Sequence, residues 1–417
     1  MSLPDDVVHE ILVRLKNDVA SLFRCASTCK RWSRLVAEVR RPDHPSSSSS
    51  FLAGFFIRKR IGVFSTDRSS MTSVVPTPGW VFQPHRRFLG SFFPETAAGG
   101  HLGRAVPLVA HHGLLLARLP SPDLEIDRST GGRRRSSTAH LVVCNLLAGT
   151  WATLPPLERN WRYWDRCCRN WRYGDTGYAI LTEVDRSSSI NRPSSTRPPA
   201  GYSPLFKVLV IYTNSGSCIL NTFSSGEARW NTPINIGSVT GKPNIWGPLK
   251  HPSAVVSRGT AHWLVSSDRD DMHIVAVDAQ TGHVTVEKIV IVSEHFSQRH
   301  CDEPHLSVAA DGTLALLYVQ RPGLRLNVFV PQDGPGPRGW LLSRVVELKP
   351  PEQRMPNQEA QLTFIGEKCG TLLVRDSTMR LYAADLETGM MTELTFCGLV
   401  NRWNVVPFEI YWPSTFF

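Results

Sequence analysis

The sequence contains no hydrophobic run long enough to cross a membrane and no leader of the secretory kind. Its most apolar early segment, Phe51 to Ile57, has seven residues, whereas a helix needs roughly 20 to span a bilayer. We therefore expect a strand there. Asp5 and Asp6 stand near the start, where a secretory signal carries basic residues, so we expect no secretion.

Catalytic signatures are also missing. The sequence has no Gly-x-Ser-x-Gly elbow, no phosphate-binding glycine loop and no His-Glu-x-x-His motif. None of the common enzyme sites is therefore indicated. We expect a chain without catalysis, bound cofactor or metal.

Cysteine does not occur in the even, regularly spaced sets that build disulfide frameworks. The nine cysteines are odd in number and irregularly placed, which fits a reducing compartment in which thiols stay free. We expect the cytoplasm, the nucleus or both.

Acidic residues are fewer than basic ones, 36 against 46, which gives a net charge of +10. A basic chain can attract nucleic acid, but the basic residues are dispersed, so no specific groove is indicated. An RNA-associated protein stays a minor alternative. The triplet Arg133-Arg134-Arg135 before Ser136 and Ser137 is either a solvated loop or a localisation, phosphorylation or acidic-ligand patch.

Glycine and proline, 30 of each, punctuate short apolar runs, which is typical of many short strands separated by turns. From residue 51 onward, an apolar run followed by Asp or Asn and then Gly recurs at intervals of roughly 50 to 60 residues after a longer first step. The copies are Leu141–Asn145 with Gly149, Cys218–Asn221 with Gly226, Ile274–Asp278 with Gly282, a degenerate Val328–Pro331 with Gly334, and Leu381–Asp385 with Gly389. Residues 186–204, rich in Ser, Arg and Pro, explain the longer step as an inserted loop.

A second motif, Gly before an apolar run, predicts a turn into a buried strand. It occurs at Gly113, Gly259, Gly312 and Gly370. A period of about 50 residues with several strands is the signature of a β-propeller blade, comparable to the kelch spacing. One further blade fits between Phe51 and His111, and we expect Val405–Trp412 to close the ring, giving about six blades. A pair of β-sandwiches is the alternative architecture.

Residues 3 to 40 differ from the rest because their apolar residues recur at helical spacing. We expect a first helix opened by Pro4, a second capped by Asn17 or Asp18, and a third around Trp32. Their apolar positions are Val7, Val8, Ile11, Leu12 and Leu15 on the first, Leu22, Cys25, Ala26 and Cys29 on the second, and Trp32, Leu35, Val36 and Val39 on the third. So small a module buries too little apolar area to be securely stable alone. We therefore expect its exposed apolar residues to pack against a partner.

Pro42, Pro45 and the serines at 46–50 mark a linker. The predicted fold class is α+β multidomain. It consists of a three-helix module at residues 1–41, a linker at 42–50 and a mainly β, propeller-like domain at 51–417.

The helical segment resembles the F-box family. The resemblance rests on Leu3–Leu15, Arg24-Cys25, Cys29–Trp32 and Leu35-Val36, which supply a Leu-Pro start, an acidic first turn, an Ile-Leu pair and a Cys-x-x-Trp. The chain departs from the common pattern at residues 15–18, where many members carry Leu-Pro. The remainder looks like the propeller-type domains of plant F-box proteins in its rhythm of strands and turns.

The resemblance implies a substrate-receptor subunit of a Skp-cullin-F-box ubiquitin ligase. The F-box would bind the Skp adaptor and through it cullin, and the β-domain would capture the protein to be ubiquitinated. Apolar surface, partly internal and partly for the adaptor, is expected from Leu3, Pro4, Val8, Ile11, Leu12, Leu15, Leu22, Cys29, Trp32 and Leu35. An alternative is a propeller that binds a carbohydrate or other small ligand and couples it to degradation.

Aromatic and arginine side chains gather in one short stretch, and such residues often anchor a recognition surface. They contact the target or fill blade cores, and they are Trp161, Arg162, Tyr163, Trp164, Arg169, Trp171, Arg172 and Tyr173.

Two sets of residues are weak candidates for metal chemistry. Cys25 and Cys29 have no second ligand pair nearby, so we expect them to pack on the apolar helical face. Cys167-Cys168 beside Asp165, and the pair His111-His112, are candidates for zinc or nucleophilic chemistry. Adjacent cysteines on a strand point in opposite directions, so we expect no site.

Overall fold

The protein is described by a computed structural model. It describes residues 3–15, 19–26, 29–39, 50–58, 72–77, 88–93, 102–120, 138–146, 149–158, 176–182, 185, 206–214, 217–240, 249–266, 271–291, 304–309, 311–320, 324–332, 339–351, 363–394, 396 and 405–411. No helix among these residues is long and apolar enough to cross a membrane.

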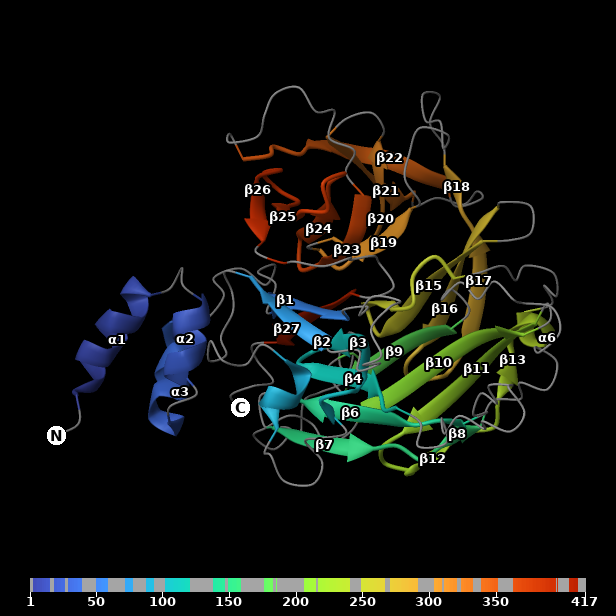
Figure 1. Ribbon diagram of the computed structural model, residues 1–417, viewed down its shortest axis with the longest axis horizontal. Helices are drawn as coiled ribbons and strands as arrows, with labels where there is room; N and C mark the ends of the chain where they lie inside the picture. The colour runs from blue at the N-terminus through green and yellow to red at the C-terminus, as the bar shows by residue number, and fades with distance from the viewer. Residues whose placement is uncertain are drawn as a thin grey trace, which may run out of the picture.

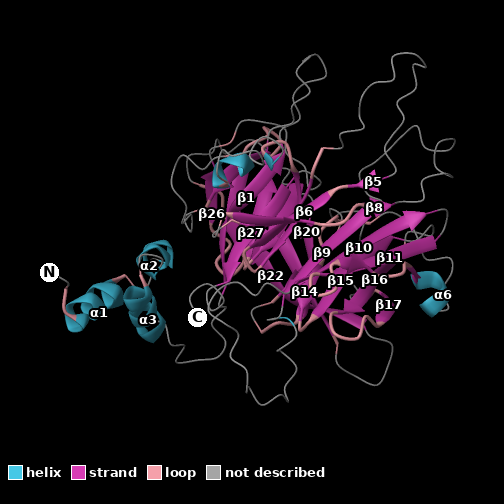
Figure 2. Cartoon of the chain, turned by 90° about the horizontal axis from the view of Figure 1, so that it is seen from below, coloured by secondary structure: helices cyan, strands magenta, loops and turns pink. Residues whose placement is uncertain are grey.

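Three helices come first, at one side of a large assembly of strands (Figures 1 and 2). They are α1 (Asp5–Arg14), α2 (Val19–Ala26) and α3 (Lys30–Val39). Pro4 occupies the N-cap of α1 and two acidic residues fill its first turn, where they favour the positive end of the helix dipole. The three predicted helical stretches are thus present, and the predicted caps Asn17 and Asp18 lie outside the described residues.

The strands form six main sheets, each a blade. Blade 1 is β27 (Val405–Tyr411), β1 (Ser50–Arg58) and β2 (Thr72–Pro76); blade 2 is β3 (Val106–His111), β4 (Leu114–Arg118), β6 (Leu141–Asn145) and β7 (Thr150–Thr153); blade 3 is β9 (Thr176–Thr182), β10 (Phe206–Asn214), β11 (Ser217–Ser224) and β12 (Arg229–Trp230), with β13 (Ile234–Asn235) also pairing β11. Blade 4 is β14 (Val255–Ser257), β15 (Thr260–Ser266), β16 (Met272–Asp278) and β17 (Val284–Lys288); blade 5 is β19 (His305–Val308), β20 (Leu314–Gln320), β21 (Arg325–Pro331) and β22 (Gly339–Glu347), with β18 (Val290–Ile291) at its edge; blade 6 is β23 (Thr363–Lys368), β24 (Thr371–Arg375), β25 (Leu381–Asp385) and β26 (Met391–Leu394).

Smaller elements complete the described chain. They are the 3-10 helix η1 (Leu89–Phe92), the strand pair β5 (Thr138–Ala139) and β8 (Leu157–Glu158), and the short helix α6 (Ile236–Thr240).

The blades close into a ring. Their inner strands β27, β3, β9, β14, β19 and β23 contact one another in that order, and β23 returns to β27. Because β27 pairs with β1 in an antiparallel ladder, the end of the β-domain is joined to its beginning. The prediction of about six blades closed by residues from 405 onward is confirmed, and the β-sandwich alternative is wrong.

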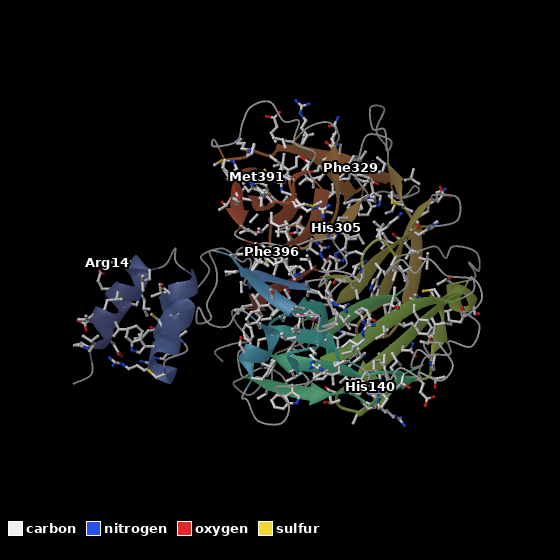
Figure 3. The ribbon with its side chains drawn as sticks, in the orientation of Figure 1. Arg14, His140, His305, Phe329, Met391 and Phe396 are labelled. Atoms are coloured by element: carbon white, nitrogen blue, oxygen red, sulfur yellow. The ribbon has the colours of Figure 1, made fainter. Side chains whose placement is uncertain are left out.

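Six apolar clusters fill the spaces between neighbouring blades, which explains why the strands are apolar on both faces. Side chains alternate along a strand, so Leu114 and Leu116 of β4 pack with blade 3 while Leu115 packs toward blade 1. Figure 3 shows such side chains in the last two blades, where Phe329 lies between blades 4 and 5 and Met391 between blades 5 and 6. A single blade would leave both faces in water, so the fold depends on neighbours.

The glycine-containing motifs are turns of two kinds. At His112-Gly113, Arg258-Gly259 and Cys369-Gly370 both residues have positive φ, as a two-residue hairpin turn of type I′ requires. These turns join each inner strand to the second strand of its blade, as the sequence predicts.

The Asp-to-Gly motif is a side-chain-locked turn. Asp278 Oδ1 accepts hydrogen bonds from Gln280 N, Thr281 N and Thr281 Oγ1 at 2.7–3.0 Å. Asp385 does the same with Glu387 and Thr388 at 2.7–3.1 Å.

The copy assigned to Asn221 is misplaced. Asn221 lies inside β11, buried, and the turn follows Ser224 instead. The residue types match the motif there, but Asn221 lies opposite Val210 in the ladder of β10 and β11 rather than at the start of a turn. Gly334 lies outside the described residues.

Two equivalent glycines give a matched stability test. Gly282 and Gly389 both have positive φ, but a Cβ on Gly389 would overlap the carbonyl of Glu347, whereas a Cβ on Gly282 would meet nothing within 4 Å. We expect Gly282→Ala to cost about 1 kcal/mol of unfolding free energy from backbone strain, and Gly389→Ala to cost at least about 2 kcal/mol because the clash adds to it. Urea unfolding of the two variants checks this, and equal costs would contradict the described packing of blades 5 and 6.

Candidate functional site

The helical module has a small core, and polar contacts hold its first helix against the third. Val8 and Leu12 of α1 are fully buried, together with Leu22, Ala26, Leu35 and Val36. Arg31 of α3 donates to Asp5 Oδ1 at 2.6 Å and to the carbonyl of Leu3. The core and these contacts fix α1 against α3 and determine which face of α1 is left outside.

That outer face carries an apolar stripe. Val7 and Ile11 are four residues apart, a spacing that lines side chains up along a helix, and Leu3 lies just ahead of the helix. The exposed fractions of Leu3, Val7 and Ile11 are 50%, 41% and 37%. Large apolar side chains grouped on one exposed face mark interaction sites. We call these three residues the α1 stripe.

The residues predicted to serve the adaptor divide into three groups by their burial. Val8, Leu12, Leu22 and Leu35 are buried in the module, Leu15 and Trp32 are half-buried, and Leu3, Pro4, Ile11 and Cys29 are exposed. Val7, which is part of the stripe, was not in the predicted set. The four-residue step from Ile11 back to Val7 was the available signal.

Cys29 corrects one expectation. The second helix ends at Ala26, and Cys29 precedes α3 as an exposed residue rather than lying on the apolar face of the second helix. Ser27 and Thr28 intervene in the sequence, and such residues favour helix ends because their hydroxyls compete for backbone hydrogen bonds.

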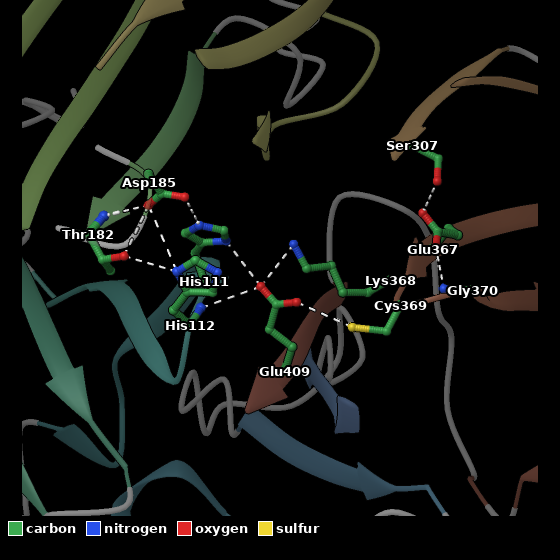
Figure 4. Close-up of polar contacts among 10 residues, drawn as sticks. All are labelled: His111, His112, Thr182, Asp185, Ser307, Glu367, Lys368, Cys369, Gly370 and Glu409. Atoms are coloured by element: carbon green, nitrogen blue, oxygen red, sulfur yellow. Dashed lines mark hydrogen bonds and ion pairs between the residues drawn. The ribbon is translucent and has the colours of Figure 1, made fainter. Parts of the chain in front are cut away.

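A second site lies at the centre of the ring (Figure 4). His111 Nε2 lies 2.9 Å from Asp185 Oδ1, and His111 Nδ1 lies 3.0 Å from Glu409 Oε1. Lys368 Nζ is 3.0 Å from the same Glu409 oxygen, and His112 Nδ1 is 2.9 Å from Thr182 Oγ1. We call His111, His112, Asp185, Lys368 and Glu409 the central cluster.

The central cluster joins blades 1, 2, 3 and 6, and further polar contacts join the remaining pairs of neighbouring blades. Ser307 of blade 5 donates to Glu367 of blade 6, and Ser257 of blade 4 donates to the carbonyl of Gly312 of blade 5 at 2.6 Å. Tyr178 N of blade 3 donates to Pro252 O ahead of blade 4 at 2.7 Å. Every junction between neighbouring blades thus has a polar contact beside its apolar core.

Burial and charge act against each other in the cluster. Burial alone would lower the pKa of His111, but the charge of Asp185 and hydrogen bonds to Asp185 and Glu409 raise it to about 9. Burial, with the charge of His111, lowers the pKa of His112 to about 3. Burial would raise the pKa of Glu409, yet Lys368 and His111 hold it well below its usual range. At neutral pH His111 is therefore an imidazolium between two carboxylates.

The sequence singled out His111-His112 as a weak candidate for zinc or nucleophilic chemistry. His111 ends β3 and His112 is the first residue of the turn, with φ of 49°, so the alternation argued for adjacent cysteines on a strand does not apply to this pair. Their rings stack, with centroids 3.8 Å apart. Asp185, Lys368 and Glu409 were missed, because residues as far apart as 111 and 409 meet only when the ring closes.

Other candidates lie outside the described residues. These are the aromatic and arginine residues between 161 and 173, the pair Cys167-Cys168 with Asp165, and Arg133 to Arg135. Their roles stay predictions. No disulfide joins the cysteines that the structure describes, and burial raises the pKa of Cys144 and of Cys218 to about 12.

Solved structures show distant likeness only. TolB from Acinetobacter baumannii shares 10% identity with a TM-score of 0.38, and the alignment covers 85% of this chain but 65% of TolB. The Dos1 propeller shares 10% identity, a TM-score of 0.32, and coverage of 80% and 67%. A lectin from Aleuria aurantia shares 9% identity, a TM-score of 0.31, and coverage of 72% and 78%. These scores are too low to carry an argument about this chain.

The family comparison is informative for the helical module. No curated protein matches the sequence, but residues 1–40 match the F-box-like family, the segment in which the motifs and the α1 stripe lie. The chain therefore combines an F-box-like segment at residues 1–40 with a six-bladed β-propeller arrangement.

Proposed function

We propose that this protein is the substrate-receptor subunit of a Skp-cullin-F-box ubiquitin ligase. The observation that carries the proposal is the α1 stripe on the segment that matches the F-box-like family. Leu3, Val7 and Ile11 are exposed apolar residues on a module too small to bury them itself, which is what a docking helix needs.

In this proposal the two parts of the chain have separate tasks. The helical module docks the Skp adaptor and through it cullin, and the propeller holds the target protein. The chain itself performs no chemistry. It raises the effective concentration of target lysines near the ubiquitin-charged enzyme, which is how tethering accelerates a reaction. Such a complex would act in the cytoplasm, the nucleus or both.

The proposal is tested by copurification. The tagged full chain, coexpressed with a Skp adaptor and a cullin, is expected to recover both in constant proportion after size-exclusion chromatography. A folded chain that elutes alone at micromolar concentrations of adaptor would overturn the proposal. If both partners are recovered, proximity labelling with the ligase blocked would identify the target.

The aromatic and arginine segment between residues 161 and 173 is the predicted target contact. Once a target is known, replacing Trp161, Tyr163 and Trp164 by alanine is expected to reduce its capture at least roughly tenfold, because such side chains dominate recognition surfaces. Target and adaptor binding are measured in parallel. Unchanged target capture would remove the segment from the proposed binding surface.

A further inference from the structure

The central cluster places three metal-ligating side chains around one point. One ligand atom each from His111, His112 and Asp185 lies within 4.8 Å of the others. His111 Nε2 and Asp185 Oδ1 are 2.9 Å apart, and His112 Nδ1 and Asp185 Oδ2 are 3.9 Å apart. Ligand atoms around a tetrahedral ion at 2.0–2.1 Å are separated by about 3.3 Å, which lies between these two distances.

The carboxylates beside the histidines are suited to a cation. Asp185 and Glu409 are buried, with 7% and 3% exposed, and they lie 2.9 and 3.0 Å from the two ring nitrogens of His111. A divalent ion bound at His111 Nε2 would take the place of the proton there and pair with Asp185 directly.

The contacts around the ligands are those of a supported metal site. His111 presents Nε2 toward Asp185 while its Nδ1 faces the Glu409 carboxylate at 3.0 Å. Metal-bound histidines commonly donate their other ring N–H to a carboxylate, which fixes the ring orientation. Lys368 in turn holds Glu409 in place. His112 is 13% exposed and so gives the site an opening toward solvent.

We propose that His111, His112 and Asp185 bind one divalent transition-metal ion that cross-links blades 2 and 3. Two imidazoles and a carboxylate suit zinc, and also ferrous iron. The two rings stack with planes 29° apart, so binding requires the His112 ring to rotate toward Asp185. Thr182 Oγ1, now 2.9 Å from His112 Nδ1, would lose that contact.

Metal content is measured first on the full chain purified without chelator. The expected result is one ion per chain, with zinc and iron distinguished by elemental analysis. After EDTA treatment, added Zn²⁺ is expected to raise the thermal midpoint, because a ligand that binds the folded state stabilises it. Mg²⁺ is expected to have no effect. A chain free of metal whose midpoint ignores saturating Zn²⁺ and Fe²⁺ would overturn the proposal.

A turn-matched pair of variants locates the site. His112→Asn removes the imidazole but creates Asn-Gly, the preferred pair for the type I′ turn that His112-Gly113 adopts. Arg258→Asn makes the same change in the equivalent turn of blade 4, where the Arg258 side chain is exposed. We expect His112→Asn to weaken Zn²⁺ binding roughly 100-fold or more, and Arg258→Asn to leave it unchanged. Equal affinity in the two variants would contradict the assignment, and the visible absorption of bound Co²⁺ gives a second readout.

Discussion

Ile11→Asp is expected to abolish stable binding of the Skp adaptor while the chain stays folded. Ile11 is 37% exposed at one end of the α1 stripe, so the module's own core does not depend on it. In the proposed complex, the same side chain lies in a desolvated interface, where a carboxylate has no partner. Burying an unpaired charge at an interface centre costs several kcal/mol.

The expected loss is at least about 2 kcal/mol, or roughly 30-fold in the dissociation constant. Val13→Asp is the matched control, because Val13 lies on the same helix with 38% exposed but off the stripe. Leu12→Asp is a poorer test, since Leu12 is fully buried and its replacement would unfold the module. Isothermal titration of both exposed variants with the adaptor measures the dissociation constants. Circular dichroism shows in parallel whether each variant is folded. Equal affinities for Ile11→Asp and Val13→Asp would remove the α1 stripe from the interface.

His111→Gln is expected to destabilise the propeller by about 3–5 kcal/mol at neutral pH. It removes the cation that lies between Asp185 and Glu409, and breaking one side of a buried ion pair leaves an uncompensated charge. The comparison is made in EDTA, because a metal bound through His111 would stabilise the wild type more than the variant and add to the difference. Urea unfolding in EDTA measures it.

The pH dependence of this effect has a definite sign. The pKa of His111 is raised to about 9 in the folded chain from the ordinary value of 6.5, so the stability that it contributes is complete below pH 6.5. That stability, up to about 3 kcal/mol, is lost as pH rises through 9. The difference between wild type and His111→Gln should therefore shrink between pH 7.5 and about 10.

His262→Gln is the control for this titration. Burial lowers the pKa of His262 to about 4, so His262 is neutral throughout the alkaline range. Its variant should differ from wild type by a constant amount from pH 7.5 to 10. If the His111→Gln difference is equally constant, His111 is not an imidazolium in the folded chain.

The sequence predicts the ring because the features that build it are local and repeated. Each type I′ turn needs a glycine, as at Gly113 and Gly370, and each locked turn needs an aspartate four residues before a glycine, as at Asp385 and Gly389. Such signals survive in a single sequence. The copy at Asn221 fails because this residue is buried within β11 and does not begin a turn.

The central cluster is not predictable in this way. Glu409 and His111 are 298 residues apart, and no local pattern marks either as a partner of the other. Their meeting depends on how many blades the ring has and on how each inner strand ends. The α1 stripe could be predicted in part. Helical spacing marks Val7 and Ile11 as apolar neighbours on one face. Only the packing of α3 shows that Val8 and Leu12 face inward, which leaves Val7 and Ile11 outside.

The pairing of β27 with β1 has a consequence for biosynthesis. During translation the helical module leaves the ribosome early, whereas blade 1 lacks its innermost strand until residues 405–411 have been made. The nascent chain can thus present α1, the helix proposed to dock the adaptor, while its propeller is still open. If that proposal holds, a product cut short before Val405 would keep the helix and lose the closed ring, and would compete for the adaptor without a complete β-domain.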